Sequence, residues 1–342
     1  MWKKIVDYYK IPEAAKEPST DSARFKKIRL ISFLTATLGY GMYYVCRLSM
    51  NVIRKPMVDD GVFTETEIGI IGSCLFFTYA IGKFCNGFIA DRSNVKKLMS
   101  TGLLISALIN LALGFTNSFI VFAVLWGING YFQSMGAASG VVSLSRWFDA
   151  SNRGTYYGYW SASHNLGEAI TFISIAILAT NFGWRYGLIG AGLIGIAYFF
   201  IMQWLMKDTP QKYGYLLEDA TSKKEEKNKA DFNASQKTVL CSPAIWILAL
   251  ASAFMYISRY AVNSWGVFYL ETMKGYSTLD ASFIISISSV CGIVGTVASG
   301  LISDKLFKGS RNIPALVFGL MNVLALCLFL LVPGVHFYID VI

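Results

Sequence analysis

The chain has 342 residues, of which 54% are hydrophobic and only 15% are charged, and its mean hydropathy is +0.48. A soluble protein of this length carries nearer a quarter charged residues, so the composition excludes an ordinary soluble globular protein. The net charge of +9 sits in short connectors between long uncharged stretches. The six cysteines show no C-x-x-C spacing and there are two histidines, which argues against a disulfide framework and against a metal centre.

Apolar segments long enough to cross a bilayer, at about 20 residues each, recur along the chain. We place nine of them, at 30–50, 68–90, 98–116, 119–145, 156–180, 185–206, 243–270, 281–303 and 312–332. Lipid admits only helices or closed barrels, and these segments are too long and too continuously apolar for barrel strands. The sequence therefore predicts an all-α integral membrane protein embedded in a lipid bilayer.

Lysine and arginine are concentrated in the N-terminal tail 1–29 and in every second connector after it. The connectors of the opposite side carry only Arg54, Lys55, Arg185 and Lys274. The positive-inside rule then predicts a cytoplasmic N-terminus. Because topology accounts for the basic charge, we expect no nucleic-acid partner.

The segment 207–242 is the only long polar connector, and its charge run Lys223-Lys224-Glu225-Glu226-Lys227 is typical of a solvated linker. It predicts four parts of the chain: a cytoplasmic tail 1–29, a six-helix bundle 30–206, a cytoplasmic linker 207–242 and a partial second bundle 243–342.

The two bundles repeat one another in register. The repeated motifs are Tyr44-x-x-Arg47-x-x-x-Asn51 with Tyr256-x-x-Arg259-x-x-x-Asn263, and Gly87-Phe88-Ile89-Ala90-Asp91-Arg92 with Gly300-Leu301-Ile302-Ser303-Asp304-Lys305. Six spans separate the copies, so they run in parallel. Parallel repeats are typical of alternating-access carriers, whose substrate site lies between the halves near the midplane.

Three cations, Arg47, Lys83 and Arg259, fall inside predicted spans. A charge at this depth is costly and usually faces a partner or a watery cavity. Two arginines at equivalent repeat positions could present their planar forks to one phosphate monoester. No carboxylate lies within a helical turn of either arginine, which favours an anion from outside. The alternative is that each arginine snorkels or is held by backbone carbonyls.

Other polar residues in the spans have open roles. Lys83 could add a third positive charge to the cavity or pair with a carboxylate elsewhere. His164 could donate to a phosphate oxygen or titrate during transport, or it could simply pack between helices. Glu168, one turn further along, could hold His164 or neutralise Arg47. His336, in a terminal loop, is not expected to be functional.

Charged pairs also mark the predicted cytoplasmic helix ends. The residues concerned are Asp91, Arg92, Asp304 and Lys305, with Arg146 and Arg153 in a neighbouring connector. A carboxylate at such an end can pair with Arg146 or Arg153 and lock one face of a carrier closed, which predicts a gate. Simple anchoring of helix ends is the alternative.

These motifs resemble the major facilitator superfamily, which the two G-x-x-x-D-[RK] loops mark, and within it the organophosphate:inorganic phosphate antiporters. The motifs of the narrower group are Tyr43-Tyr44-x-x-Arg47, Gly82-Lys83-Phe84, Phe132-Gln133-Ser134, Arg153-Gly154, His164-Asn165-x-Gly167, Asp208-Thr209-Pro210-Gln211 and Tyr256-x-x-Arg259-Tyr260 with Trp265. The resemblance covers residues 25–335.

The resemblance implies a major facilitator fold of two six-helix parallel repeats, with nine of the twelve helices present here. It implies that Arg47 and Arg259 bind phosphate with the help of His164. The residues that it places along the route are Lys83, Tyr40, Tyr44, Tyr79 and Tyr256. It further implies a monomeric carrier of a bacterial inner membrane, without cofactor, that exchanges cytoplasmic inorganic phosphate for a phosphorylated sugar or glycerol 3-phosphate.

The chain departs from the family in ways that matter. With nine spans, we expect it to lack the last quarter of the fold, which includes part of the cavity wall. Glu168 stands where the family usually has glycine, which predicts proton coupling or a changed preference for the charge state of phosphate. Ala137 and Ser264 stand where the glycerol-phosphate carriers have a tryptophan and an acid. The stretches Phe132-Gln133-Ser134 and Ser163-His164-Asn165-Leu166-Gly167 resemble the hexose-phosphate members more closely.

Two other functions remain open. One is a transporter-like membrane sensor of external hexose phosphate, which would use the same anion site. The other is a proton-coupled carrier of an organic solute, favoured by Glu168 and disfavoured by the two unpaired arginines. The sequence shows no nucleophile–base pair, metal cluster or nucleotide loop, so we expect no enzyme.

Overall fold

The structure is a computed structural model that describes residues 7–15, 21–215, 241–305 and 312–341. Its regular structure over these residues is entirely helical. Large apolar side chains, among them Phe77, Phe115 and Trp204, lie on the outer surface, each more than 70% exposed. In water such a surface would be an aggregation hazard, whereas against lipid tails it is the expected one.

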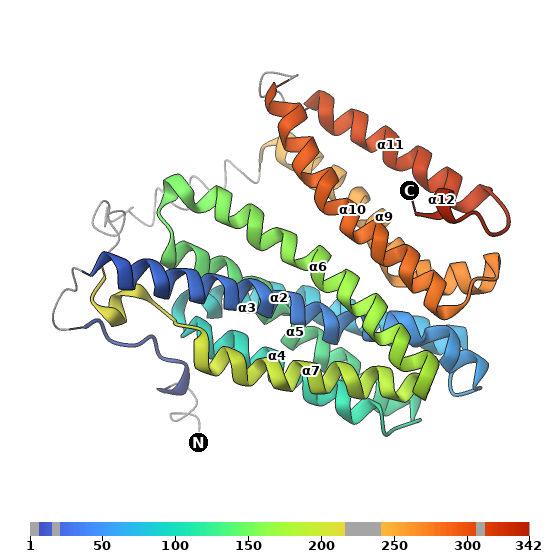
Figure 1. Cartoon of the computed structure of the whole chain (residues 1–342), viewed down its shortest axis with the longest axis horizontal. Helices are drawn as coiled ribbons and strands as arrows, with labels where there is room; N and C mark the ends of the chain where they lie inside the picture. Colours follow the sequence, from blue (N-terminus) through green and yellow to red (C-terminus); the bar gives the residue numbers. More distant parts are fainter. Residues whose placement is uncertain (1–6, 16–20, 216–240, 306–311, 342) are drawn as a thin grey trace.

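Six long helices form the first group (Figure 1). They are α2 (Ser22–Asp59), α3 (Glu65–Arg92), α4 (Val95–Leu113), α5 (Phe119–Trp147), α6 (Ala150–Phe182) and α7 (Trp184–Leu205). Their starts follow from the sequence: Asp21 and Asn94 accept backbone N–H groups of the first turns of α2 and α4, and Thr64 forms a capping box with Glu67. The short helix η1 (Pro210–Tyr213) follows α7.

A second group follows residues 216–240. It comprises α9 (Pro243–Tyr269), its π-helical continuation η3 (Leu270–Lys274), α10 (Thr278–Lys305), α11 (Asn312–Leu331) and the short α12 (Phe337–Asp340). This group lies beside the first one, with α9 packed against α2 and α10 against α6 (Figure 1). The surfaces between the two groups are therefore built from the first and seventh predicted spans and from the fifth and eighth.

All nine predicted spans coincide with helices of the described structure. Seven of them (α3, α4, α5, α6, α7, α9 and α10) are long and apolar enough to cross a membrane. Helix α2 carries more polar and charged residues, and the apolar part described for α11, Ala315–Leu331, is shorter than a typical span. The structure confirms an all-helical membrane protein, with helices that extend beyond the predicted limits at several ends.

The packing of α2 against α6 depends on two glycines at their crossing. A Cβ atom added to Gly167 would lie 2.6 Å from the carbonyl oxygen of Gly41. Small residues at a helix crossing let the backbones approach closely, which is a common way to pack helices in lipid. Tyr44 and Arg47 of α2 and His164 and Glu168 of α6, all within two turns of these glycines, line the same cavity.

Candidate functional site

A cavity of about 380 Å³ lies between the two groups of helices. Its walls come from α2, α3, α5, α6 and α9. All eight residues that the sequence predicts for substrate binding line it: Tyr40, Tyr44, Arg47, Tyr79, Lys83, His164, Tyr256 and Arg259. Glu168 lines it as well. Residues more than 200 positions apart in the sequence thus face one space. Their role in binding remains a prediction.

Arg47 is buried among aromatic rings. Its side chain is 5% exposed, and its Cζ atom lies 4.2 Å from the ring centroid of Tyr79, 5.6 Å from that of Tyr260 and 5.8 Å from that of Tyr44. Such cation–π contacts stabilise a guanidinium but leave its N–H groups without acceptors. The buried Nη2 atom of Arg47 has no hydrogen-bond partner among the described residues. A cation in this state is suited to accept an anion.

Arg259 is in a different state, because it has a carboxylate partner. Its Nη2 atom lies 3.2 Å from Oε1 of Glu168, which is 2% exposed. The same carboxylate oxygen accepts a hydrogen bond of 2.9 Å from the Asn263 side chain, and Oδ1 of Asn165 lies 3.4 Å from the same nitrogen of Arg259. The Arg259 side chain itself is 40% exposed to the cavity.

This pair corrects two expectations. Glu168 was expected to hold His164 or to neutralise Arg47, but the structure pairs it with Arg259. The expectation that neither arginine has a carboxylate partner holds for Arg47 among the described residues and is wrong for Arg259. The error has a simple cause: the acid comes from another helix, 91 positions earlier in the chain, and neighbours along one helix do not reveal it.

The remaining predicted residues surround these two arginines. The imidazole of His164 lies 5.8 Å from the ring of Tyr44, measured between centroids, and is half-buried. The Nζ atom of Lys83 lies 5.4 Å from the Tyr79 centroid, so one tyrosine ring contacts both Lys83 and Arg47.

The two other tyrosines of the predicted set stack on aromatic neighbours. Tyr40 stacks on Trp160 with centroids 4.5 Å apart, and Tyr256 on Tyr260 at 5.8 Å. The ring of Tyr256 is 54% exposed.

Equivalent residues of the two repeats also contact each other beside the cavity, which Asn263 lines. The side-chain nitrogen of Asn51 donates to the backbone oxygen of Asn263 over 3.0 Å. These asparagines occupy the last position of the repeated motif in α2 and α9. The contact joins the two groups of helices on the Asp59 side of Arg47.

Arg54 reinforces this junction, which its position in the sequence did not predict. The sequence places it in a connector, which is wrong because α2 continues to Asp59. Its side chain is buried, donates to the backbone oxygen of Ser264 over 2.5 Å and to Oδ1 of Asn51 over 3.0 Å, and stacks on Trp265. The signal was present: positions 47, 51 and 54 follow the i, i+4, i+7 spacing of one helix face.

A second connector cation is also buried. Lys274, placed in a connector by its sequence, lies at the end of η3 and forms an ion pair with Asp340. Both side chains are buried. Connector positions read from hydropathy alone are therefore not always solvated.

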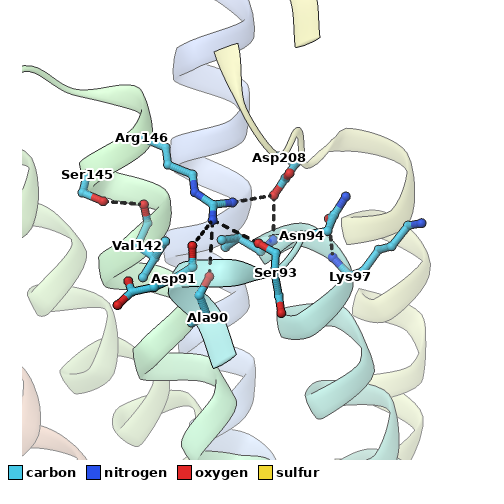
Figure 2. A network of polar contacts seen from close by, with 10 residues as sticks. Ala90, Asp91, Ser93, Asn94, Lys97, Val142, Ser145, Arg146 and Asp208 are labelled. Atoms are coloured by element: carbon cyan, nitrogen blue, oxygen red, sulfur yellow. Dashed lines mark hydrogen bonds and ion pairs between the residues drawn. The ribbon is translucent and has the colours of Figure 1, made fainter. Parts of the chain in front are cut away.

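The predicted gate has a different composition from the one expected. Arg146 forms its ion pair with Asp208 over 3.2 Å and donates to the backbone oxygens of Ala90, Asp91 and Ser93 (Figure 2). Asp91 takes part through its carbonyl group, and its carboxylate points away from Arg146 in Figure 2. The expected contact of that carboxylate with Arg146 is wrong in this conformation.

This network ties together helices of one group only. Asp208 also accepts from the backbone N–H of Val95 over 2.6 Å, so it caps α4 while it holds Arg146. Burial raises the pKa of the Asp208 carboxyl above its ordinary value, against the opposing effects of Arg146 and the backbone N–H groups.

The other members of the predicted gate lie apart from this network. Arg153 donates to the backbone oxygen of Phe148. Arg92 lies in the last turn of α3. Asp304 and Lys305 lie in the last turn of α10, and their side chains are outside the described residues.

Comparison with known proteins agrees with this geometry. The model of the Major Facilitator Superfamily matches residues 30–342. The chain is 32% identical to the membrane sensor protein UhpC of Salmonella typhimurium over 86% of this chain and 69% of that protein. It is 33% identical to a probable hexose phosphate transport protein of Chlamydia muridarum over 94% of this chain and 74% of that protein. It is 31% identical to the glycerol-3-phosphate transporter of Bacillus subtilis over 90% and 72%.

A solved structure agrees at the level of the fold. A bacterial homolog of the human lysosomal transporter Spinster, in an inward-facing and unoccupied conformation, matches 92% of this chain and 71% of its own chain, with a TM-score of 0.73 at 18% identity. The family model and the relatives above 30% identity lead to one conclusion: the chain belongs to the Major Facilitator Superfamily.

Proposed function

We propose that the protein is a secondary active transporter that exchanges a phosphorylated sugar or glycerol 3-phosphate for inorganic phosphate by alternating access. The observation that carries the proposal is the convergence of Arg47 and Arg259, from equivalent repeat positions, on one cavity between the two groups of helices. Both relatives named as transporters above act on a phosphorylated compound. The cavity of about 380 Å³ lies within the range for small-molecule sites, and an adjoining pocket of about 580 Å³ shares His164, Glu168 and Arg259 with it.

The charged side chains of the cavity would each have a role in binding the phosphoryl group. Arg47, with its unpartnered Nη2 atom, would bind phosphoryl oxygens from the α2 side, and Arg259 would bind them from α9. Lys83 and His164 line the same cavity and add donors. An anion held by both arginines links the two groups of helices, so its binding can bias how they pack.

The junction of α2 with α9 provides the barrier on one side. The bonds from Asn51 to Asn263 and from Arg54 to Ser264 lie beyond Arg47, toward the end of α2 at Asp59. The positive-inside rule assigns that end to the outside of the membrane and the N-terminus to the cytoplasm. The similarity to bacterial transporters is our ground for placing the protein, as a monomer, in a bacterial inner membrane. For the cavity to open outward, these bonds must break.

A sensor is the second candidate, because the chain is 32% identical to a membrane sensor protein over most of its length. A sensor of external hexose phosphate would use the same arginines to bind its ligand, and turnover would be unnecessary. Exchange therefore has to be measured separately from binding.

The test uses the protein reconstituted in liposomes. Uptake of labelled glucose 6-phosphate and glycerol 3-phosphate is measured with inorganic phosphate inside and, as a control, without it. We expect uptake that requires internal phosphate. Uptake that ignores internal phosphate would contradict exchange, and binding of glucose 6-phosphate without any exchange would favour the sensor.

A further inference from the structure

We infer that Glu168 is an internal anion that occupies Arg259 in the empty site, and that a phosphate dianion displaces it while Glu168 takes up one proton. The inference rests on the proposed function, since it concerns the same cavity. It adds the charge state of the bound substrate and names the residue that sets it.

The first step is the competition for Arg259. Nη2 of Arg259 lies 3.2 Å from Oε1 of Glu168, and both residues line the cavity. A carboxylate oxygen and a phosphoryl oxygen are acceptors of the same kind for a guanidinium fork. We take the phosphoryl group that bridges both arginines to compete with Glu168 for Nη2 of Arg259, whereas Nη2 of Arg47 has no partner to lose among the described residues.

The second step concerns the displaced carboxylate. Glu168 is 2% exposed, and the side chains of Asn263 and Asn165 beside it cannot neutralise its charge. The titratable and charged groups around the same cavity are Tyr40, Tyr44 and Arg47 of α2, Tyr79 and Lys83 of α3, Tyr157 and His164 of α6, and Tyr256, Arg259 and Tyr260 of α9. Glu168 also lines a second, adjoining pocket, to which α10 contributes Ser288 and Ser289 and α12 contributes Asp340, the partner of Lys274.

The proton follows from these surroundings. Once a dianion holds Arg47 and Arg259, an ionised Glu168 would be a buried charge that has lost its cation and faces a second anion. Such a charge is avoided by protonation. The proton comes from the aqueous phase with the entering anion and returns to it when the anion leaves. Each bound phosphate dianion would then be accompanied by one proton on Glu168.

The experiment counts protons in binding. The purified protein is titrated calorimetrically with glucose 6-phosphate, and in parallel with inorganic phosphate, in buffers of different ionisation enthalpy. At about pH 8 a phosphate monoester is almost fully dianionic, because its second pKa is about 6. Protons that are taken up on binding at that pH are therefore bound by groups of the protein and not by the ligand. We expect about one proton per bound glucose 6-phosphate in the unsubstituted protein and none in Glu168→Gln.

A matched variant separates Glu168 from the other titratable group beside it. His164→Asn removes the imidazole of the same helix, and whatever its affinity, its proton uptake should remain. Proton uptake that is unchanged in Glu168→Gln, or lost only in His164→Asn, overturns the inference and leaves the exchange mechanism standing. Absence of any binding to the unsubstituted protein contradicts the proposed function itself and the inference with it.

A second measurement needs no variant at Glu168. The infrared difference spectrum of the unsubstituted protein, recorded on addition of glucose 6-phosphate, should gain the stretch of a protonated carboxyl group that shifts in deuterated water. A spectrum without that band, at a concentration where calorimetry shows binding, overturns the inference.

Discussion

The two arginines of the cavity are equivalent in the sequence repeat and unequal in the structure. Arg47 is buried and held by the faces of aromatic rings, whereas Arg259 is partly exposed and paired with Glu168. A cation held only by rings keeps its hydrogen-bonding capacity for a ligand. We therefore expect Arg47 to contribute more than Arg259 to the affinity with which the empty site binds an anion. Arg259 is expected to exchange its partner Glu168 for the bound anion.

The ring of Tyr79 tests how Arg47 is positioned. Tyr79→Leu removes the face that lies 4.2 Å from the guanidinium, and Tyr79→Phe keeps it. A cation–π contact contributes about 0.5–2 kcal/mol, so we expect the leucine variant to bind glucose 6-phosphate roughly 2- to 30-fold more weakly. The phenylalanine variant should stay close to the unsubstituted protein. Equal affinities in all three proteins, measured by calorimetry, would contradict this role of the ring.

At the scale of helices, the crossing of α2 and α6 sets the distance between the residues of the cavity. Gly167→Ala would place a methyl group 2.6 Å from the backbone oxygen of Gly41 and force the helices apart. We expect a loss of about 1–3 kcal/mol of stability, visible as a lower melting temperature in detergent. Gly158→Ala in the same helix is the control, since nothing lies within 4 Å of its added Cβ atom. Similar melting of the two variants would show that the crossing tolerates a larger residue.

The contact of α2 with α9 has its own test. Arg54→Leu removes the donor to the backbone oxygen of Ser264 and the stacking on Trp265. We expect faster hydrogen–deuterium exchange in 262–270, because the two groups of helices separate more often at this end. Lys55→Gln is the control, because it also removes a positive charge from this end of α2 while the ion pair of Lys55 is with Asp59 of its own helix. Exchange that stays the same in Arg54→Leu would mean that this junction does not hold the helices together.

At the scale of the whole molecule, hydropathy predicts where the helices are but not how they pair. The nine predicted spans all coincide with helices, because runs of apolar residues long enough for a bilayer leave little choice of structure. Helix ends beyond the lipid carry ordinary polar residues, so the continuation of α2 to Asp59, and with it the burial of Arg54, escapes a hydropathy argument.

The same limit applies to contacts between distant residues. The repeat predicts that Arg47 and Arg259 face one site, because equivalent positions in parallel repeats are related by symmetry. The pairing of Glu168 with Arg259, and of Arg146 with Asp208, depends on how helices are rotated against each other. No local pattern in the sequence reports that rotation.

The orientation of the chain in the membrane is a prediction about the whole molecule. Lysines and arginines place the N-terminal tail and the linker 207–242 in the cytoplasm. Trypsin should cleave near the run from Lys223 to Lys227 in inside-out vesicles and leave it intact in right-side-out vesicles. Cleavage only from the outer face would reverse the assignment and, with it, the side on which the α2–α9 junction closes the cavity.

The central claim is that two arginines from the two repeats bind one phosphoryl group during exchange. Its most direct test is the rate of phosphate-driven uptake of glucose 6-phosphate into liposomes by Arg47→Lys, by Arg259→Lys and by the double variant. Lysine keeps the charge and loses the planar fork. We expect each single substitution to reduce uptake by at least about tenfold, because it removes a charge-assisted hydrogen bond that contributes about 1.5–3 kcal/mol. We expect the double variant to be inactive. Uptake that survives both substitutions would contradict the account.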